Sequence, residues 1–155
     1  MCRPNWNNYF MTMAEIASSR ATCSRARVGA VIVKNNHVLV TGYNGAIHKA
    51  DHCTEVGCKI VNNHCIRTVH AEMNAIVNCA RQGSDLQDSE LYVTHFPCVR
   101  CMPLVLQAGI SKIYYLHAYN IDPFCIELAK QTGCELIQLE SELTTIYNNL
   151  GKAIN

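Results

Sequence analysis

The sequence has no long apolar segment, no large excess of either charge and no basic cluster. Its longest apolar run covers residues 28–33, whereas a membrane-spanning helix needs about 20 apolar residues. The net charge is +1, and no group of Lys and Arg forms the basic stripe typical of proteins that bind long nucleic acids. These absences favour a small-molecule substrate over a membrane or a nucleic-acid partner.

The sequence also lacks a polar linker, an internal repeat and, near its start, the apolar region of a secretory signal. With 49% apolar residues, we expect one globular domain over residues 1–155, located in the cytoplasm. In a reducing compartment, the ten cysteines are expected to be metal ligands and small buried side chains rather than disulfides.

Hydrophobic periodicity predicts a layered α/β fold. Residues 28–33 and 38–40 are predicted strands joined by a tight turn at Asn35 and Asn36, since asparagine tolerates positive φ. Strands then alternate with helices, which predicts parallel strands joined by right-handed crossovers. The later strands are expected at 91–94, 113–116 and 135–138, and helices are expected to begin near residues 5, 71, 97, 122 and 141.

The first and last helices are each expected to bury an apolar face, with Asn5 and Ser141 as their N-caps. The first face would comprise Trp6, Tyr9, Phe10, Met13, Ile16 and Ala17, and the last would comprise Leu143, Ile146, Tyr147 and Leu150. By contrast, residues from about 46 to 68 show no clear period and are rich in Cys and His. We expect an irregular insertion there, ordered by something other than a core.

The most informative pattern is His70-Ala71-Glu72 followed by Pro97-Cys98-Val99-Arg100-Cys101. One imidazole and two thiolates are three zinc ligands, and a three-ligand protein site leaves a position for water. A carboxylate two residues after the histidine can carry that water's protons. The two cysteines, spaced i and i+3 in a predicted first helical turn, share one face of the helix. The pattern therefore predicts a hydrolytic zinc centre formed by His70, Cys98 and Cys101, with Glu72 as its proton carrier.

The cysteine pair alone does not decide between catalysis and a structural role. By itself, Cys98-x-x-Cys101 is as typical of half a structural zinc knuckle, or of a redox pair, as it is of a catalytic centre. A zinc-stabilised binding module without catalysis would also contain such a pair. The position of Glu72 beside a ligand favours catalysis, because a structural site needs no proton carrier.

Together these residues resemble the signature of the zinc-dependent cytidine and deoxycytidylate deaminases. The matching stretches are residues 28–33, 41–45, 70–76, 97–101 and 107–110, in the order of that family. The Gly42-Tyr43-Asn44-Gly45 loop is most similar to the deoxycytidylate branch. The resemblance implies a three-layer α/β/α fold with a mixed five-stranded sheet and helices on both faces.

The resemblance also implies hydrolysis of dCMP to dUMP and ammonia, supplying dUMP for thymidylate synthesis. Glu72 would take a proton from zinc-activated water and deliver protons to N3 and to the leaving amino group. The backbone N–H of Ala71 would meet the base carbonyl, and Asn44 would hold a sugar hydroxyl. Arg27 and Tyr119 are the candidates for contact with the phosphate.

The resemblance further suggests a second, structural zinc in the insertion. Cys23, Cys53 and His64 fall where such ligands occur; Cys58 is the first candidate for the fourth ligand, and Cys65 is the second. The alternative is a set of buried free thiols. Cys2, Cys79, Cys125 and Cys134 are expected to be core or surface thiols.

Regulation and assembly are expected from the family resemblance alone. The resemblance implies a homo-oligomer, often a hexamer in this family. It also implies activation by dCTP, which Mg²⁺ would accompany, and inhibition by dTTP. Residues 45–48 and Arg81 fall where effector and subunit contacts occur, although Arg81 could equally stabilise a helix end. Alternative substrates are a nucleoside, dCTP, tRNA or single-stranded DNA; the last two are disfavoured by the charge balance.

Overall fold

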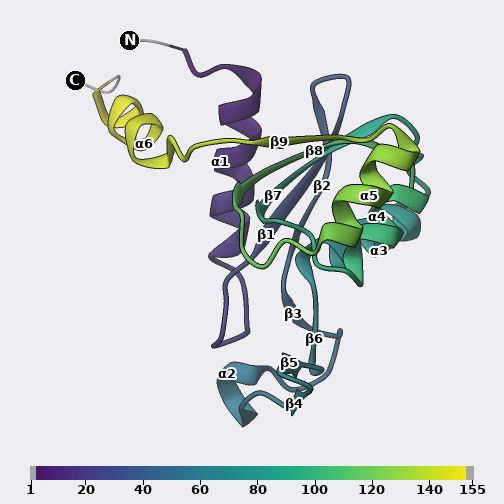
Figure 1. Cartoon of the computed structure of the whole chain (residues 1–155). Coiled ribbons are helices and arrows are strands. Elements are labelled where there is room, and N and C mark those ends of the chain that lie inside the picture. The colour runs from purple at the N-terminus through teal and green to yellow at the C-terminus, as the bar shows by residue number, and fades with distance from the viewer. Residues whose placement is uncertain (1–2, 153–155) are drawn as a thin grey trace.

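The computed structural model describes residues 3–152, and a mixed five-stranded sheet lies at its centre (Figure 1). The spatial order is β2-β1-β7-β8-β9. The strands β1, β2 and β7 pair antiparallel, while β7, β8 and β9 run parallel. Their bounds are β1 Gly29–Lys34, β2 His37–Tyr43, β7 Ser89–His95, β8 Ile110–His117 and β9 Glu135–Gln138.

Helices cover both faces of this sheet (Figure 1). The helix α1 packs on one face, and α3, α4 and α5 lie on the other. The helices are α1 Trp6–Ser18, α3 Ala71–Gln82, α4 Cys101–Gln107, α5 Pro123–Thr132 and α6 Leu143–Lys152. The predicted three-layer α/β/α fold, with its mixed five-stranded sheet, is confirmed.

Alternation along β1 and β7 divides the apolar core between the two faces, because successive side chains of a strand point to opposite sides. On the α1 face, Val31 and Tyr92 pack against Phe10 and Met11. On the opposite face, the core includes Ala30, Ile32, Leu91, Val93, Ala75, Met102 and Val105. Cys79, Cys125 and Cys134 belong to this second core, as expected of structural thiols, whereas Cys2 lies outside the described residues.

Several local sequence signals act as predicted. The Asn5 side chain accepts a hydrogen bond from the backbone N–H of Asn8 at 2.8 Å and caps α1. Asn35 and Asn36 have φ of 51° and 59° between β1 and β2, the left-handed backbone that a two-residue hairpin turn requires. Gly83 ends α3 in the left-handed conformation.

The buried faces of the terminal helices differ from prediction. In α1, Phe10, Met11 and Ala14 are buried, but Trp6 and Ile16 are exposed. The prediction that Tyr147 and Leu150 of α6 point inward is wrong: they are 73% and 63% exposed. The helix α6 lies away from the sheet body in Figure 1, so the described part of the chain leaves this face uncovered.

The Cys/His-rich insertion extends from one end of the sheet (Figure 1). The sequence predicts an irregular segment, but the insertion contains short regular elements. The strands β3 Gly45–Ala46 and β6 Thr68–Val69 pair at its base, followed outward by α2 Cys53–Val56 and the hairpin of β4 Ile60–Val61 with β5 His64–Cys65. These short elements contribute little to either apolar core.

Candidate active site and second metal centre

Two chain segments bring His70, Cys98 and Cys101 together. His70 is the N-cap residue of α3, Cys98 lies in the turn that leads into α4, and Cys101 is the first residue of α4. The sequence predicts that Pro97 opens this helix. The helix begins at Cys101, although the Cys98 carbonyl already accepts hydrogen bonds from the N–H groups of Cys101 and Met102 at 2.9 Å.

The spacing of these three ligand atoms fits a zinc ion. His70 Nδ1 lies 3.5 Å from Cys98 Sγ and 3.3 Å from Cys101 Sγ. Tetrahedral zinc with ordinary Zn–S and Zn–N bonds separates such ligands by about 3.6 Å. Because these donors are one imidazole and two thiols, the set matches a three-ligand zinc centre that leaves a fourth position for water.

The surroundings of the cysteines favour a thiolate at Cys98. A hydrogen bond from Cys101, with others from His70 and from backbone N–H groups, lowers the pKa of Cys98 to about 3. The same contact with Cys98, together with burial, raises the pKa of Cys101. The Cys98 thiolate in turn raises the pKa of His70.

Glu72 lies beside this centre in the first turn of α3 and is 4% exposed. Burial raises the pKa of Glu72 to about 7, against the opposing effects of its own backbone N–H and of His70. A carboxyl group with a pKa near neutrality can both accept and return a proton.

A close backbone contact fixes the depth of α3 against the sheet. A Cβ at Gly42 of β2 would lie 2.4 Å from the Ala71 carbonyl oxygen and 2.9 Å from the Ala75 nitrogen. Only glycine permits this approach. The start of α3, which carries His70 and Glu72, is therefore held directly on β2.

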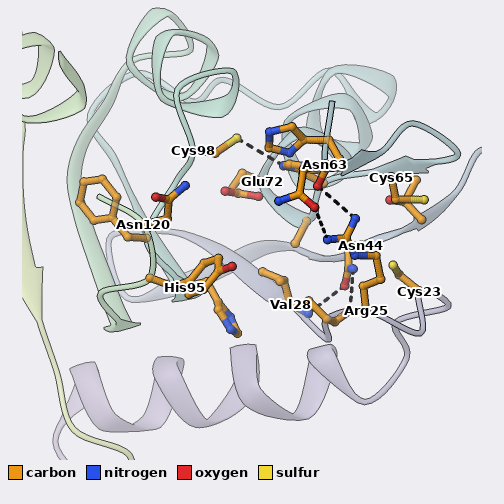
Figure 2. A pocket seen from close by; sticks show the side chains of 17 residues that line it. Cys23, Arg25, Val28, Asn44, Asn63, Cys65, Glu72, His95, Cys98 and Asn120 are labelled. Carbon is orange, nitrogen blue, oxygen red and sulfur yellow. Dashed lines mark hydrogen bonds between the residues drawn. The ribbon is translucent and has the colours of Figure 1, made fainter. Parts of the chain in front are cut away.

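A cavity of about 530 Å³ opens onto these residues (Figure 2). Its lining includes His70, Ala71, Glu72 and Cys98 together with the predicted substrate residues Asn44 and Tyr119. Ala71 is fully buried, whereas Tyr119 is 75% exposed. The volume is in the range of small-ligand sites.

Asn44 has a structural task in addition to lining the cavity. Its Oδ1 accepts a hydrogen bond from the Val28 backbone N–H at 2.8 Å, and its Nδ2 donates to the Ala26 carbonyl at 2.9 Å (Figure 2). An amide group has one further N–H and one further lone pair. Asn44 can thus hold the segment before β1 in place and still contact a ligand.

The predicted phosphate residue Arg27 does not line this cavity; it lines a neighbouring one of about 440 Å³. Arg25 lines both cavities. The prediction of Arg27 rests on its position just before β1. Because both arginines precede β1 in an exposed segment, sequence position alone does not tell which one faces the site. His95 and Asn120 also line the cavity, and no sequence pattern points specifically to Asn120.

Four cysteine sulfurs form a second cluster next to the cavity: Cys23, Cys53, Cys58 and Cys65. Cys53 Sγ lies 3.5 Å from Cys65 Sγ, and Cys23 Sγ lies 3.9 Å from Cys58 Sγ. Four thiolates around a zinc ion are about 3.8 Å apart, so this set fits a closed structural zinc. The sequence predicts His64 as a ligand, but the cluster contains Cys65 instead. The two residues are neighbours on β5, and successive side chains of a strand point to opposite sides.

The electrostatics of this cluster favour thiolates at two positions. Burial raises the pKa of Cys65, but hydrogen bonds from the Arg67 backbone, Cys53 and Thr68 outweigh it and lower the pKa to about 6. A hydrogen bond from Ser24 lowers the pKa of Cys58. The nine cysteines in the described part of the chain are all free thiols, which leaves these four available to a metal.

A three-layer α/β/α sheet that carries a His-Cys-Cys set and a buried carboxylate defines the class of zinc-dependent deaminases. The model of the cytidine and deoxycytidylate deaminase zinc-binding region matches residues 4–117. The chain belongs to this family.

Relatives and a solved structure agree with this assignment. The ComE operon protein 2 of Bacillus subtilis (strain 168) is 43% identical over 90% of this chain and 74% of that protein. The deoxycytidylate deaminase of Schizosaccharomyces pombe is 36% identical over 88% of this chain, which spans only 44% of that enzyme. The dCMP deaminase of the cyanophage S-TIM5, solved with dCMP and dUMP, is 33% identical over 90% of this chain and 100% of that chain, with a TM-score of 0.78.

Proposed function

We propose that this protein hydrolyses dCMP to dUMP and ammonia. The observation that carries the proposal is that one cavity joins two of the zinc ligands, His70 and Cys98, and Glu72 to Arg25, a cation suited to a phosphate. Similarity to a deaminase solved with dCMP and dUMP supports the same substrate. A zinc-dependent deaminase that accepts another cytosine or adenine substrate is the alternative.

In this proposal His70, Cys98 and Cys101 hold the zinc ion. When bound, zinc lowers the pKa of a coordinated water and so supplies the nucleophile at neutral pH. Glu72 would accept one proton from water, as the water oxygen bonds to C4, and pass it to N3; it would then take the proton of the new C4 hydroxyl and pass it to the amino group, which leaves as ammonia when the C4–N bond breaks. The Ala71 N–H and the Asn44 amide orient the base and the sugar from the cavity wall.

The second cluster is proposed to hold a structural zinc through Cys23, Cys53, Cys58 and Cys65. Such an ion would link the segment before β1 to the insertion, which has almost no apolar core of its own. Two zinc ions per chain are therefore expected.

The substrate is tested by ammonia release from dCMP, deoxycytidine, dCTP and a single-stranded oligonucleotide, with zinc content measured on the same sample. We expect kcat/KM for dCMP to exceed that for deoxycytidine by about 100-fold, because a charged hydrogen bond to phosphate contributes about 1.5–3 kcal/mol. Faster turnover of deoxycytidine or of the oligonucleotide would contradict the proposed substrate.

Regulation by dCTP and dTTP, a role for Mg²⁺ with the triphosphate, and assembly into hexamers belong to the proposal through the family resemblance alone. We expect dCTP with Mg²⁺ to change a sigmoidal dCMP saturation curve toward a hyperbolic one, and dTTP to do the reverse. Initial rates measured over a range of dCMP, with light scattering for oligomer size, test this. Identical curves with and without dCTP would refute regulation and leave the chemistry intact.

A cytoplasmic location is likewise part of the proposal. No helix within residues 3–152 combines the length and the apolar character that crossing a bilayer demands.

A further inference from the structure

Arg25 has an unusual position at the cavity. Among the described residues that line the cavity, it is the single Lys or Arg. Its Nη1 donates a hydrogen bond to the backbone carbonyl of Asn63 at 3.0 Å, and its Nη2 donates to Asn63 Oδ1 at 3.2 Å (Figure 2). One residue of the insertion therefore accepts hydrogen bonds from both terminal nitrogens of the Arg25 guanidinium.

These partners fix the guanidinium without neutralising it. Both acceptor oxygens of Asn63 are uncharged, and no ion pair within residues 3–152 involves Arg25. A guanidinium has five N–H donors, so donors remain for an anion after the two bonds to Asn63. Arginine held in this way keeps its full positive charge at the cavity wall.

The position of Asn63 is set by the insertion. Asn62 and Asn63 have φ of 47° and 61° and form the two-residue turn between β4 and β5, where Val61 pairs with His64. The same hairpin carries Cys65, whose sulfur lies 3.5 Å from that of Cys53. The turn that holds Arg25 is thus tied to the four-cysteine cluster.

The segment that carries Arg25 is tied to the same cluster. Cys23, two residues earlier, has its sulfur 3.9 Å from that of Cys58 in the insertion. The Ser24 hydroxyl oxygen lies 3.5 Å from the same Cys58 sulfur, so contacts at Cys23, Ser24 and Arg25 join this segment to the insertion. Together they leave Arg25 little freedom to move away from the cavity.

We propose that Asn63 of the insertion is the positioning residue for Arg25, the cation that the proposed function assigns to the substrate phosphate. The insertion then selects a nucleoside monophosphate over the unphosphorylated nucleoside, and it does so by pre-orienting one cation. Ordering a long side chain before binding removes an entropic cost that the ligand would otherwise meet. This inference rests on the proposed function, in which dCMP is the substrate.

The test compares Asn63→Gly with Asn62→Gly in the zinc-loaded enzyme. Glycine tolerates the positive φ at both positions, so each change keeps the turn and removes one side chain. For Asn63→Gly we expect KM for dCMP to rise about 5-fold, the effect of one side-chain hydrogen bond, with kcat unchanged. Neither variant should alter kcat/KM for deoxycytidine, and Asn62→Gly should resemble the wild type.

A double-mutant cycle shows whether Asn63 acts through Arg25. Arg25→Gln should lower kcat/KM for dCMP about 30-fold, because it removes a charge-assisted contact with phosphate. Adding Asn63→Gly to Arg25→Gln should then have no further effect. Zinc content and the thermal unfolding midpoint, measured on each variant, confirm that the fold is retained.

Equal losses with dCMP and deoxycytidine in Asn63→Gly would overturn the inference, since they indicate a general change in the site. The inference would also be overturned if the wild type prefers dCMP and both Asn63→Gly and Arg25→Gln keep that preference. In that case dCMP would remain the proposed substrate, but neither residue would select it. A wild-type enzyme without any preference for dCMP would contradict the proposed function, and this inference with it.

Discussion

Glu72→Gln is expected to lower kcat for dCMP by about 10²-fold to 10⁴-fold, the range typical for loss of a positioned general acid–base. The amide keeps the size of the carboxyl group, so the buried position beside His70 and Cys98 should accept it. It cannot accept a proton from water or return one to the base. Stopped assays of dUMP formation with saturating dCMP measure this loss.

Glu140→Gln is the matched control, since Glu140 is an exposed carboxylate outside the cavity. It should retain wild-type kcat. Both variants should bind the same amount of zinc as the wild type and unfold at similar temperatures. Undiminished turnover by Glu72→Gln, in a preparation free of other deaminases, would show that another group moves the protons.

Cys65→Ser is expected to reduce the zinc content from two ions per chain to one. Cys65 supplies one of four sulfurs that all lie within 4.8 Å of one another. An ion bound at 1,000 times its dissociation constant stabilises the folded state by about 4 kcal/mol. Its loss should lower the thermal midpoint by roughly 8–16 °C for a chain of this size. Metal analysis after dialysis and calorimetry measure the two effects.

His64→Ala is the matched control at the neighbouring position of β5. The sequence pattern favours His64 as a ligand, but this residue lies outside the cysteine cluster and lines the active-site cavity. The variant should keep two zinc ions and the wild-type midpoint. Loss of zinc in His64→Ala, with two ions retained in Cys65→Ser, would restore His64 as the ligand.

The elements of the fold follow closely from local sequence signals. The strand predicted at 135–138 coincides with β9, and Gly83 and Gly133 end α3 and α5 as left-handed C-caps. These signals are reliable because they depend on backbone sterics within a few residues. Burial follows less closely: Ile16 and Tyr147 lie at helical spacing in apolar stripes but are exposed. Periodicity indicates that a helix has an apolar face, whereas a packing partner decides whether that face is covered.

The catalytic ligand set can be anticipated for a similar reason. His70 precedes Glu72 by two residues, and Cys98 precedes Cys101 by three, so each half of the motif is local. The packing of α3 against α4 then brings the two halves within 3.5 Å. His64 and Cys65 are neighbours on β5, where a shift of one residue changes the face to which a side chain points. Arg25 and Arg27 lie in an exposed segment without regular structure, so no period tells which of the two faces the cavity.

The sequence by itself determined the chemistry of this protein: three soft ligands and a carboxylate at fixed spacings, on a chain whose alternating pattern produces an α/β/α sheet. Only the tertiary structure decided which cation faces the cavity and which residue completes the four-cysteine cluster. Both answers depend on the insertion, whose short elements are oriented by contacts with Cys23 and Arg25 rather than by a core of their own. Such contacts join residues 35 or more positions apart, and no local pattern encodes them.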